Sequence, residues 1–127
     1  MDKNKTVPTA AELELLKILW KIEPATVRKV HEAVNADHKA AYTTTLKMFQ
    51  IMHEKGFVKR DESARAHVYT ANYSQEQTQS SIIKDMLAKA FGGSKFDLVV
   101  RALGDSTSSD EIAEIRGLLD SLEKKTR

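Results

Sequence analysis

The most restrictive feature of this 127-residue sequence is a change of hydrophobic period at Gly56. Before Gly56, apolar side chains recur every three or four residues, which is typical of helices that bury one face. After it, two short runs at 57–61 and 67–71 are rich in β-branched and aromatic residues, which is typical of strands. A glycine can end a helix in the left-handed conformation that other residues avoid. The pattern therefore predicts helices followed directly by a β-hairpin with a polar tip at 62–66.

Three helices are predicted before this hairpin. Thr9 and Glu12 have the spacing of a capping box at the start of the first helix, and Thr26 can cap a short second one. The polar segment 35–39 is the expected turn, and a third helix is predicted from about Ala41 to Lys55. We expect the buried face of the first helix to consist of Leu13, Leu16, Leu19 and Trp20.

The chain after residue 73 predicts three more helices. Ser74 with Gln77 and Ser108 with Glu111 repeat the capping pattern, and a short helix is expected between them. Short helices in a small body cannot cover all their own apolar side chains, so we expect a second copy of the chain to do so. The predicted dimerisation residues are Ile82, Ile83, Met86, Leu87, Phe91, Phe96, Val99, Val100, Leu103, Ile112, Ile115, Leu119 and Leu122.

This order of elements predicts a mainly α fold with a small β-hairpin wing. Residues 1–73 correspond to a winged helix-turn-helix domain, the arrangement in which one helix enters the major groove of DNA. Residues 74–127 correspond to a helical dimerisation domain. The net charge is only +2, but the excess of basic residues lies in the N-terminal half, where the predicted DNA-binding domain is.

The outward face of the predicted third helix carries side chains that suit base edges and phosphates. Threonine can donate or accept a hydrogen bond, glutamine can pair with adenine, and lysine can reach guanine or phosphate. Residues in the first turn also lie at the positive end of the helix dipole. This face consists of Tyr42, Thr43, Thr44, Leu46, Lys47 and Gln50. The wing adds Lys59, Arg60, Arg65 and His67 for contacts to the DNA backbone or minor groove.

Composition and spacing argue against several other classes of protein. The chain has no cysteine, which excludes disulfides, thiolate zinc sites and cysteine nucleophiles and fits a cytoplasmic location. We expect no signal peptide, no membrane insertion and no cofactor. The four histidines, His31, His38, His53 and His67, lack a metal-ligand spacing such as HExxH, and there is no P-loop, GxGxxG or GxSxG motif. We therefore expect that the protein is not an enzyme.

Four stretches, 9–20, 41–46, 54–58 and 65–69, resemble the penicillinase-repressor (BlaI/MecI/CopY) family of bacterial transcription regulators. The resemblance implies a homodimeric repressor that occludes a promoter by binding a pseudo-palindromic operator in double-stranded DNA. It places the family's recognition-helix contacts on Tyr42, Thr43, Thr44, Lys47 and Gln50, and its wing contacts near Arg65 and His67. Leu46 stands where several relatives carry a basic residue.

Some members of the family are inactivated when a signal from a membrane-bound sensor metalloprotease leads to cleavage in the helix after a Gly-Gly pair. The equivalent position here is Arg101–Ala102, which differs from the Asn-Phe pair of relatives that are cut. The copper-responsive branch uses C-terminal cysteines. Since this chain has none, copper sensing by that chemistry is excluded.

Two alternatives stay open at the level of sequence. One is a protein-interaction module that has the winged-helix shape but binds its partner through the C-terminal helices, without sequence-specific DNA binding. The other is a zinc-binding regulator whose histidine and carboxylate ligands come together only in space. The salt dependence of binding distinguishes the first alternative from a DNA-binding protein, because phosphate contacts weaken steeply as salt is added.

Overall fold

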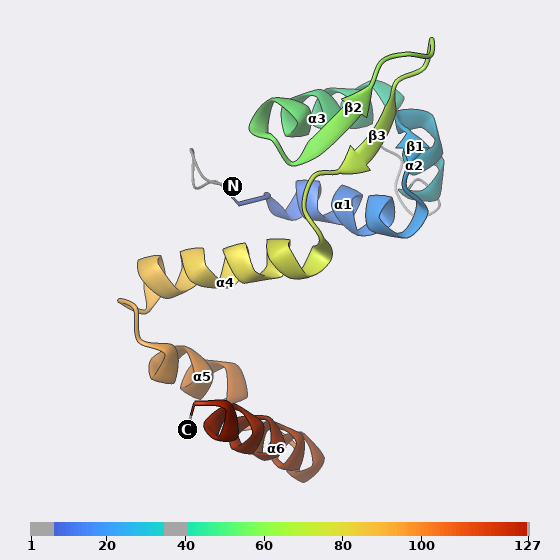
Figure 1. Ribbon diagram of the computed structural model, residues 1–127. Coiled ribbons are helices and arrows are strands. Elements are labelled where there is room, and N and C mark those ends of the chain that lie inside the picture. The colour runs from blue at the N-terminus through green and yellow to red at the C-terminus, as the bar shows by residue number, and fades with distance from the viewer. Residues whose placement is uncertain (1–6, 35–40, 127) are drawn as a thin grey trace. The chain divides into compact units, whose positions relative to one another are not determined.

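The structure, a computed structural model, describes residues 7–34 and 41–126 and is mainly helical, as predicted. The expected turn at 35–39 lies outside the described residues. Figure 1 shows the order of the elements along the chain. Their bounds are α1 Ala10–Ile22, β1 Ala25–Thr26, α2 Val27–Val34, α3 Tyr42–Lys55, β2 Val58–Asp61, β3 Val68–Ala71, α4 Gln75–Ala90, α5 Lys95–Leu103 and α6 Ser109–Lys125.

The chain divides into two compact units, the first ending at Met86 and the second beginning at Leu87. The first unit holds α1 to β3 and most of α4, and the second holds the end of α4 together with α5 and α6. The division between compact units therefore falls within α4. The functional boundary between residues 73 and 74 stays a prediction.

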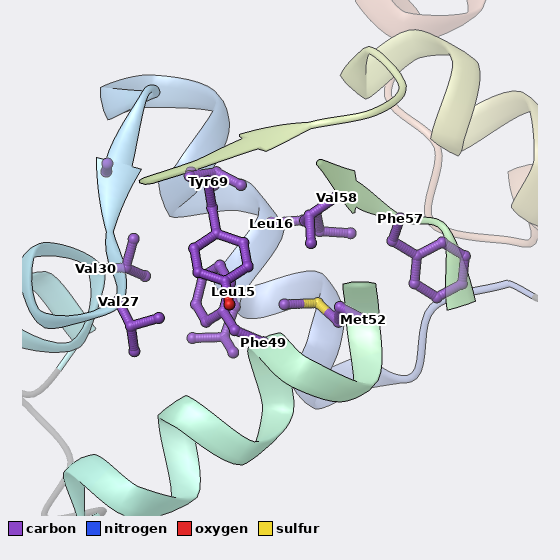
Figure 2. Packing of buried hydrophobic residues seen from close by; sticks show 11 residues of the cluster. Leu15, Leu16, Val27, Val30, Phe49, Met52, Phe57, Val58 and Tyr69 are labelled. Atoms are coloured by element: carbon purple, nitrogen blue, oxygen red, sulfur yellow. The ribbon is translucent and has the colours of Figure 1, made fainter. Parts of the chain in front are cut away.

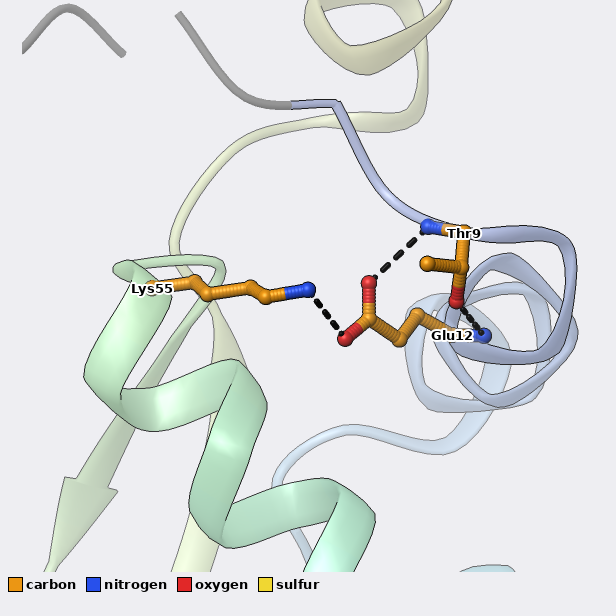
Figure 3. A network of polar contacts seen from close by, with 3 residues as sticks. All are labelled: Thr9, Glu12 and Lys55. Atoms are coloured by element: carbon orange, nitrogen blue, oxygen red, sulfur yellow. Dashed lines mark hydrogen bonds and ion pairs between the residues drawn. The ribbon is translucent and has the colours of Figure 1, made fainter. Parts of the chain in front are cut away.

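A capping box begins α1, as the sequence predicts. The backbone N–H of Glu12 donates to Thr9 Oγ1 at 3.2 Å, and the backbone N–H of Thr9 donates to Glu12 Oε1 at 2.9 Å. The second carboxylate oxygen of Glu12 accepts a hydrogen bond from Lys55 Nζ at 2.9 Å (Figure 3). Glu12 is buried, so this pairing with Lys55 satisfies its charge and ties the first turn of α1 to the last turn of α3.

The buried face of α1 differs in part from the predicted one. Leu16 and Leu19 are buried as expected, but Leu15 joins them, whereas Leu13 and Trp20 are only half-buried. The Trp20 indole N–H donates to the carbonyl of Tyr73 at 3.0 Å, so this ring contacts the segment leading into α4. The helix is thus rotated slightly from the predicted orientation, toward the side that carries the buried carboxylate of Glu12.

The hydrophobic core of the first unit joins α1, α2, α3 and the small sheet (Figure 2). Phe49 of α3 and Tyr69 of β3 lie at its centre, with ring centroids 4.9 Å apart and ring planes inclined at 56°. A tilted aromatic pair of this kind adds to the stabilisation that comes from apolar burial alone. The buried apolar residues are Leu15, Leu16, Leu19, Ala25, Val27, Val30, Phe49, Met52, Phe57, Val58 and Tyr69.

The sheet is antiparallel and has the strand order β1-β3-β2. Strands β2 and β3 form the predicted hairpin, with Val58 opposite Ala71 and Asp61 opposite Val68. Strand β1 was not predicted, because two residues are too few to show a strand pattern. It pairs with the far edge of β3 and thereby fixes the start of α2 against the wing.

Gly56 ends α3 in the predicted left-handed conformation, with a φ of +86°. The backbone N–H of Phe57 donates to the carbonyl of Met52 at 2.9 Å, so the helix closes and the chain turns directly into β2. A side chain at residue 56 would have open space around it, so the requirement for glycine here is one of backbone conformation only.

The second unit consists of capped helices. Ser94 Oγ accepts the backbone N–H of Asp97 at 3.1 Å at the start of α5, and Ser108 forms the predicted capping box with Glu111 at the start of α6. Neither α5 nor α6 has a buried residue within the single chain. None of the helices in the described part of the chain is long and apolar enough to cross a membrane.

Candidate nucleic-acid interface

Helix α3 has one face in the core and another in solvent. Thr45, Phe49 and Met52 are buried and hold the helix against the sheet and α2. The predicted contact residues Thr43, Thr44, Lys47 and Gln50 are exposed, and Tyr42 is half-buried. The core therefore fixes α3 by residues other than those that would read DNA, which is the arrangement that a rigid recognition helix requires.

The N-terminus of α3 lacks the side-chain cap that begins α1, α5 and α6. Its N-cap residue is Ala41, whose methyl group cannot accept a hydrogen bond from the first-turn N–H groups. Those groups carry the positive end of the helix dipole, and only the backbone is seen to accept from them: the N–H of Thr44 donates to the carbonyl of Ala41 at 3.0 Å. The positive end of a helix favours anions, so this end of α3 suits a phosphate of a DNA backbone.

Leu46 corrects one part of the predicted outward face. It is half-buried and packs against the core instead of standing free in solvent. Leu46 is half-buried because it follows buried Thr45 and so lies at the edge of the helix face that contacts α2 and the wing. Leu46 therefore separates the core from the exposed face, and the polar contact surface of α3 is narrower than the sequence predicted.

The wing presents the basic side chains that the sequence predicts. Lys59, Arg65 and His67 are exposed, whereas Arg60 is half-buried and forms a 2.7 Å ion pair with Glu62. Hydrogen bonds with the Tyr69 side chain and then with Glu62 raise the pKa of Arg60 above its ordinary value, so it stays charged. The hydrogen bond and charge of Arg60 lower the pKa of Glu62 in turn.

The tip of the wing is held by a local turn. Asp61 Oδ1 accepts the backbone N–H of Ser63 at 2.9 Å, and the pKa of Asp61 is lowered chiefly by this backbone hydrogen bond and then by the Ser63 side chain. An aspartate that bonds to the backbone two residues on is a common way to fix a turn. This turn thereby fixes the end of β2 from which the polar tip with Arg65 extends.

A hollow of about 440 Å³ lies between the start of α2, the outward side of α3 and the wing. Five predicted contact residues line it, namely Tyr42, Gln50, Arg60, Arg65 and His67. Thr43, Thr44, Lys47 and Lys59 are exposed but do not line this hollow. The structure thus brings the helix and wing parts of the predicted surface together around one depression that is rich in cationic side chains.

One residue of this hollow, Arg28 of α2, was missed at the level of sequence. Its guanidinium carbon lies 4.4 Å from the centre of the Tyr42 ring, which is within the range of a cation–π contact. The sequence places Arg28 in the first turn of a helix that Thr26 can cap. It does not show that the Arg28 side chain contacts Tyr42 of α3.

Many of the predicted dimerisation residues are exposed in the single chain. Phe96 is the most extreme, with 76% of its surface exposed, and Leu119 has 60%. Ile83, Met86, Val99, Val100, Ile112 and Leu122 are also exposed, whereas Ile82, Leu87, Phe91, Leu103 and Ile115 are half-buried. Leu118, at 58%, belongs with the exposed group although it was not among the predicted residues. Arg101 and Ala102 lie exposed in the last turn of α5.

Metal-binding side chains do not gather in the part of the chain that the structure describes. No group of three or more histidine, aspartate or glutamate side chains there has the geometry to hold a metal ion. His38, one of the four histidines, lies outside the described residues.

Two packed helices α2 and α3, followed by a hairpin wing on a three-stranded sheet, define a winged-helix protein of the class found among transcriptional regulators. A solved structure of a MarR family transcription regulator shares the fold, with a TM-score of 0.50 and 20% sequence identity. That alignment covers 97% of this chain and 74% of the other. Within the class, residues 8–121 match the penicillinase repressor family, and the chain belongs to that family.

Two relatives agree with this assignment. The chain is 30% identical to the transcriptional regulator BlaI of Mycobacterium tuberculosis over 113 residues, which cover 88% of this chain and 82% of that protein. It is 22% identical to the methicillin resistance regulatory protein MecI of Staphylococcus aureus over 121 residues, or 94% of this chain and 98% of that protein. The family and these relatives are transcriptional regulators rather than enzymes.

Proposed function

We propose that this protein is a transcriptional repressor that binds a pseudo-palindromic operator as a homodimer. The observation that carries the proposal is the exposed polar face of α3, with Thr43, Thr44, Lys47 and Gln50, beside a basic wing. Helix α3 enters the major groove, where these side chains reach base edges. The wing lies on the adjacent backbone, where its cations contact phosphates.

The homodimer is supported by the apolar surface of α4, α5 and α6. Nine large hydrophobic side chains in these helices are exposed in the single chain. Soluble monomers rarely leave so many large apolar groups in water, and covering them by a second copy is favoured by the hydrophobic effect. Two recognition helices on half-sites about one helical turn apart also supply the operator selectivity that one small module lacks.

The relief of repression is proposed to follow the cleavage route that the family resemblance suggests. Arg101–Ala102 lies within α5, so a protease that needs an extended substrate must first unwind the last turn of this helix. Gly104, which follows α5 with a positive φ, ends the helix close to that bond. Cleavage there would separate α6 from the DNA-binding unit and weaken any dimer that depends on α6.

The proposal is tested by selecting duplex fragments from genomic DNA with the full chain and measuring affinity for the selected site at several salt concentrations. We expect one selected sequence with two-fold symmetry, and an affinity that falls by orders of magnitude between about 50 and 200 mM salt. A chain that retains no duplex at low salt, and whose interactions are insensitive to salt, contradicts the proposal. That result would favour the protein-interaction module.

A further inference from the structure

Arg28 connects α2 to the start of the recognition helix. It lies in the first turn of α2 and is exposed, and its guanidinium carbon lies over the Tyr42 ring, 4.4 Å from the ring centre. Among the residues that the structure describes, no carboxylate forms an ion pair with Arg28. None of the described carboxylates therefore neutralises its charge.

The Tyr42 ring is itself held by buried groups. The ring of His31 meets it edge to face, with centroids 5.6 Å apart and planes at 87°. His31 Nδ1 forms a 2.9 Å hydrogen bond with Thr45 Oγ1, and the two residues are only 8% and 4% exposed. A fixed histidine therefore orients Tyr42, and Tyr42 provides a fixed surface for the guanidinium of Arg28.

A cation–π contact does not use up the hydrogen-bond donors of an arginine. A guanidinium carries five N–H donors, and its attraction to the face of an aromatic ring is electrostatic, so these donors can still bind a phosphate. Arg65 and His67 of the wing line the same hollow as Arg28 and Tyr42. A phosphate oxygen at this hollow would meet cations from α2 as well as from the wing, and an arginine held in advance loses less rotamer entropy on binding.

We propose that Arg28 is a DNA-phosphate contact held in its binding position by Tyr42, so that α2 is a third element of the interface. The inference rests on the proposed function and extends it to a helix whose residues were not assigned a contact. Tyr42 is then a positioning residue, which acts by holding a cation, in addition to any base edge that it reaches.

The test compares full-length Arg28→Ala with the unaltered chain on the selected operator and on a random duplex. We expect the variant to bind both duplexes roughly tenfold more weakly, and the salt slope to fall by about one unit. Lys21→Ala is the matched control, because it removes one charge from an exposed position on α1 that does not line the hollow. It should change affinity less than threefold and leave the slope unaltered.

Two further variants test the role of Tyr42. Arg28→Lys should recover most of the salt slope but only part of the affinity, because an ammonium cannot stack and donate as a planar fork does. In a Tyr42→Leu background, Arg28→Ala should cost less than threefold, since the arginine is no longer held. Thermal unfolding and circular dichroism confirm that each variant is folded.

Four results decide between these possibilities. Unchanged affinity and slope for folded Arg28→Ala overturn the inference, and so does a loss confined to the operator. Full additivity with Tyr42→Leu overturns the positioning role. Failure of the unaltered chain to bind any duplex in a salt-dependent way instead refutes the proposed function, and this is measured before any variant is made.

Discussion

At the scale of single residues, the exposed side chains of α3 and of the wing are expected to act differently. Lys47→Ala or Gln50→Ala should each cost about 1–3 kcal/mol of binding free energy on the operator and much less on random DNA, if they read bases. Lys59→Ala should weaken binding to both duplexes and lower the salt slope by about one unit, as a phosphate contact does. Titrations on the two duplexes measure this, and equal losses for all three variants would remove the base-reading assignment.

Glu62 offers a second prediction at this scale, because it holds Arg60 of the wing in an ion pair. Glu62→Gln removes a negative charge from the wing and with it the ion pair to Arg60, so we expect tighter binding to any duplex at low salt. Glu14→Gln is the control, because Glu14 also forms an exposed ion pair, with Lys17, but on α1. Equal effects of the two substitutions would show that only net charge matters.

The pH dependence of this pair follows from the direction of the pKa shift. Arg60 lowers the pKa of Glu62 in the folded chain. The pair's contribution to the stability of the fold is therefore fully present above the ordinary glutamate pKa of 4.5. It is lost as the pH falls through the lowered value. The affinity gain of Glu62→Gln should therefore be complete at neutral pH, and an NMR titration of the Glu62 carboxyl should have its midpoint below 4.5.

At the scale of elements, the junction between α3 and β2 depends on Gly56. Gly56→Ala places a side chain in the left-handed region without meeting any neighbour, so the expected loss is conformational, about 1–2 kcal/mol of unfolding free energy. Gly117→Ala in α6 is the control, because alanine is preferred to glycine by about 1 kcal/mol inside a helix. Denaturant unfolding measures both, and a neutral Gly56→Ala would contradict this account of the helix end.

The elements that could be predicted from sequence are those with local signals. Capping pairs predicted where α1, α4 and α6 begin, and Gly56 predicted where α3 ends. Each of these signals acts within one helical turn. Strand β1 and the burial of Leu15 could not be predicted, because both depend on packing against residues far along the chain. The same holds for the site: the polar face of α3 is visible in sequence, whereas the contact between Arg28 and Tyr42 is not.

At the scale of the whole molecule, the proposed dimer is tested by substituting one of the exposed apolar residues of α6, Leu119. Leu119→Lys in the full chain should weaken self-association at least tenfold, because it replaces apolar contact with a charge that has no partner in the interface. Ser121→Lys, an exposed polar position on the same helix, is the control. Sedimentation equilibrium measures both, and an unaltered chain that is monomeric at micromolar concentration would remove the dimer from the proposal.

The division of α3 into a core face and a solvent face also bears on how such regulators diverge. Phe49 and Met52 hold the helix, while Thr43, Thr44, Lys47 and Gln50 make no contribution to the buried core. Substitutions at surface sites of this kind usually change stability little. A lineage could therefore acquire a new target site through a few point mutations in the outward residues, without first having to evolve compensating changes in the interior.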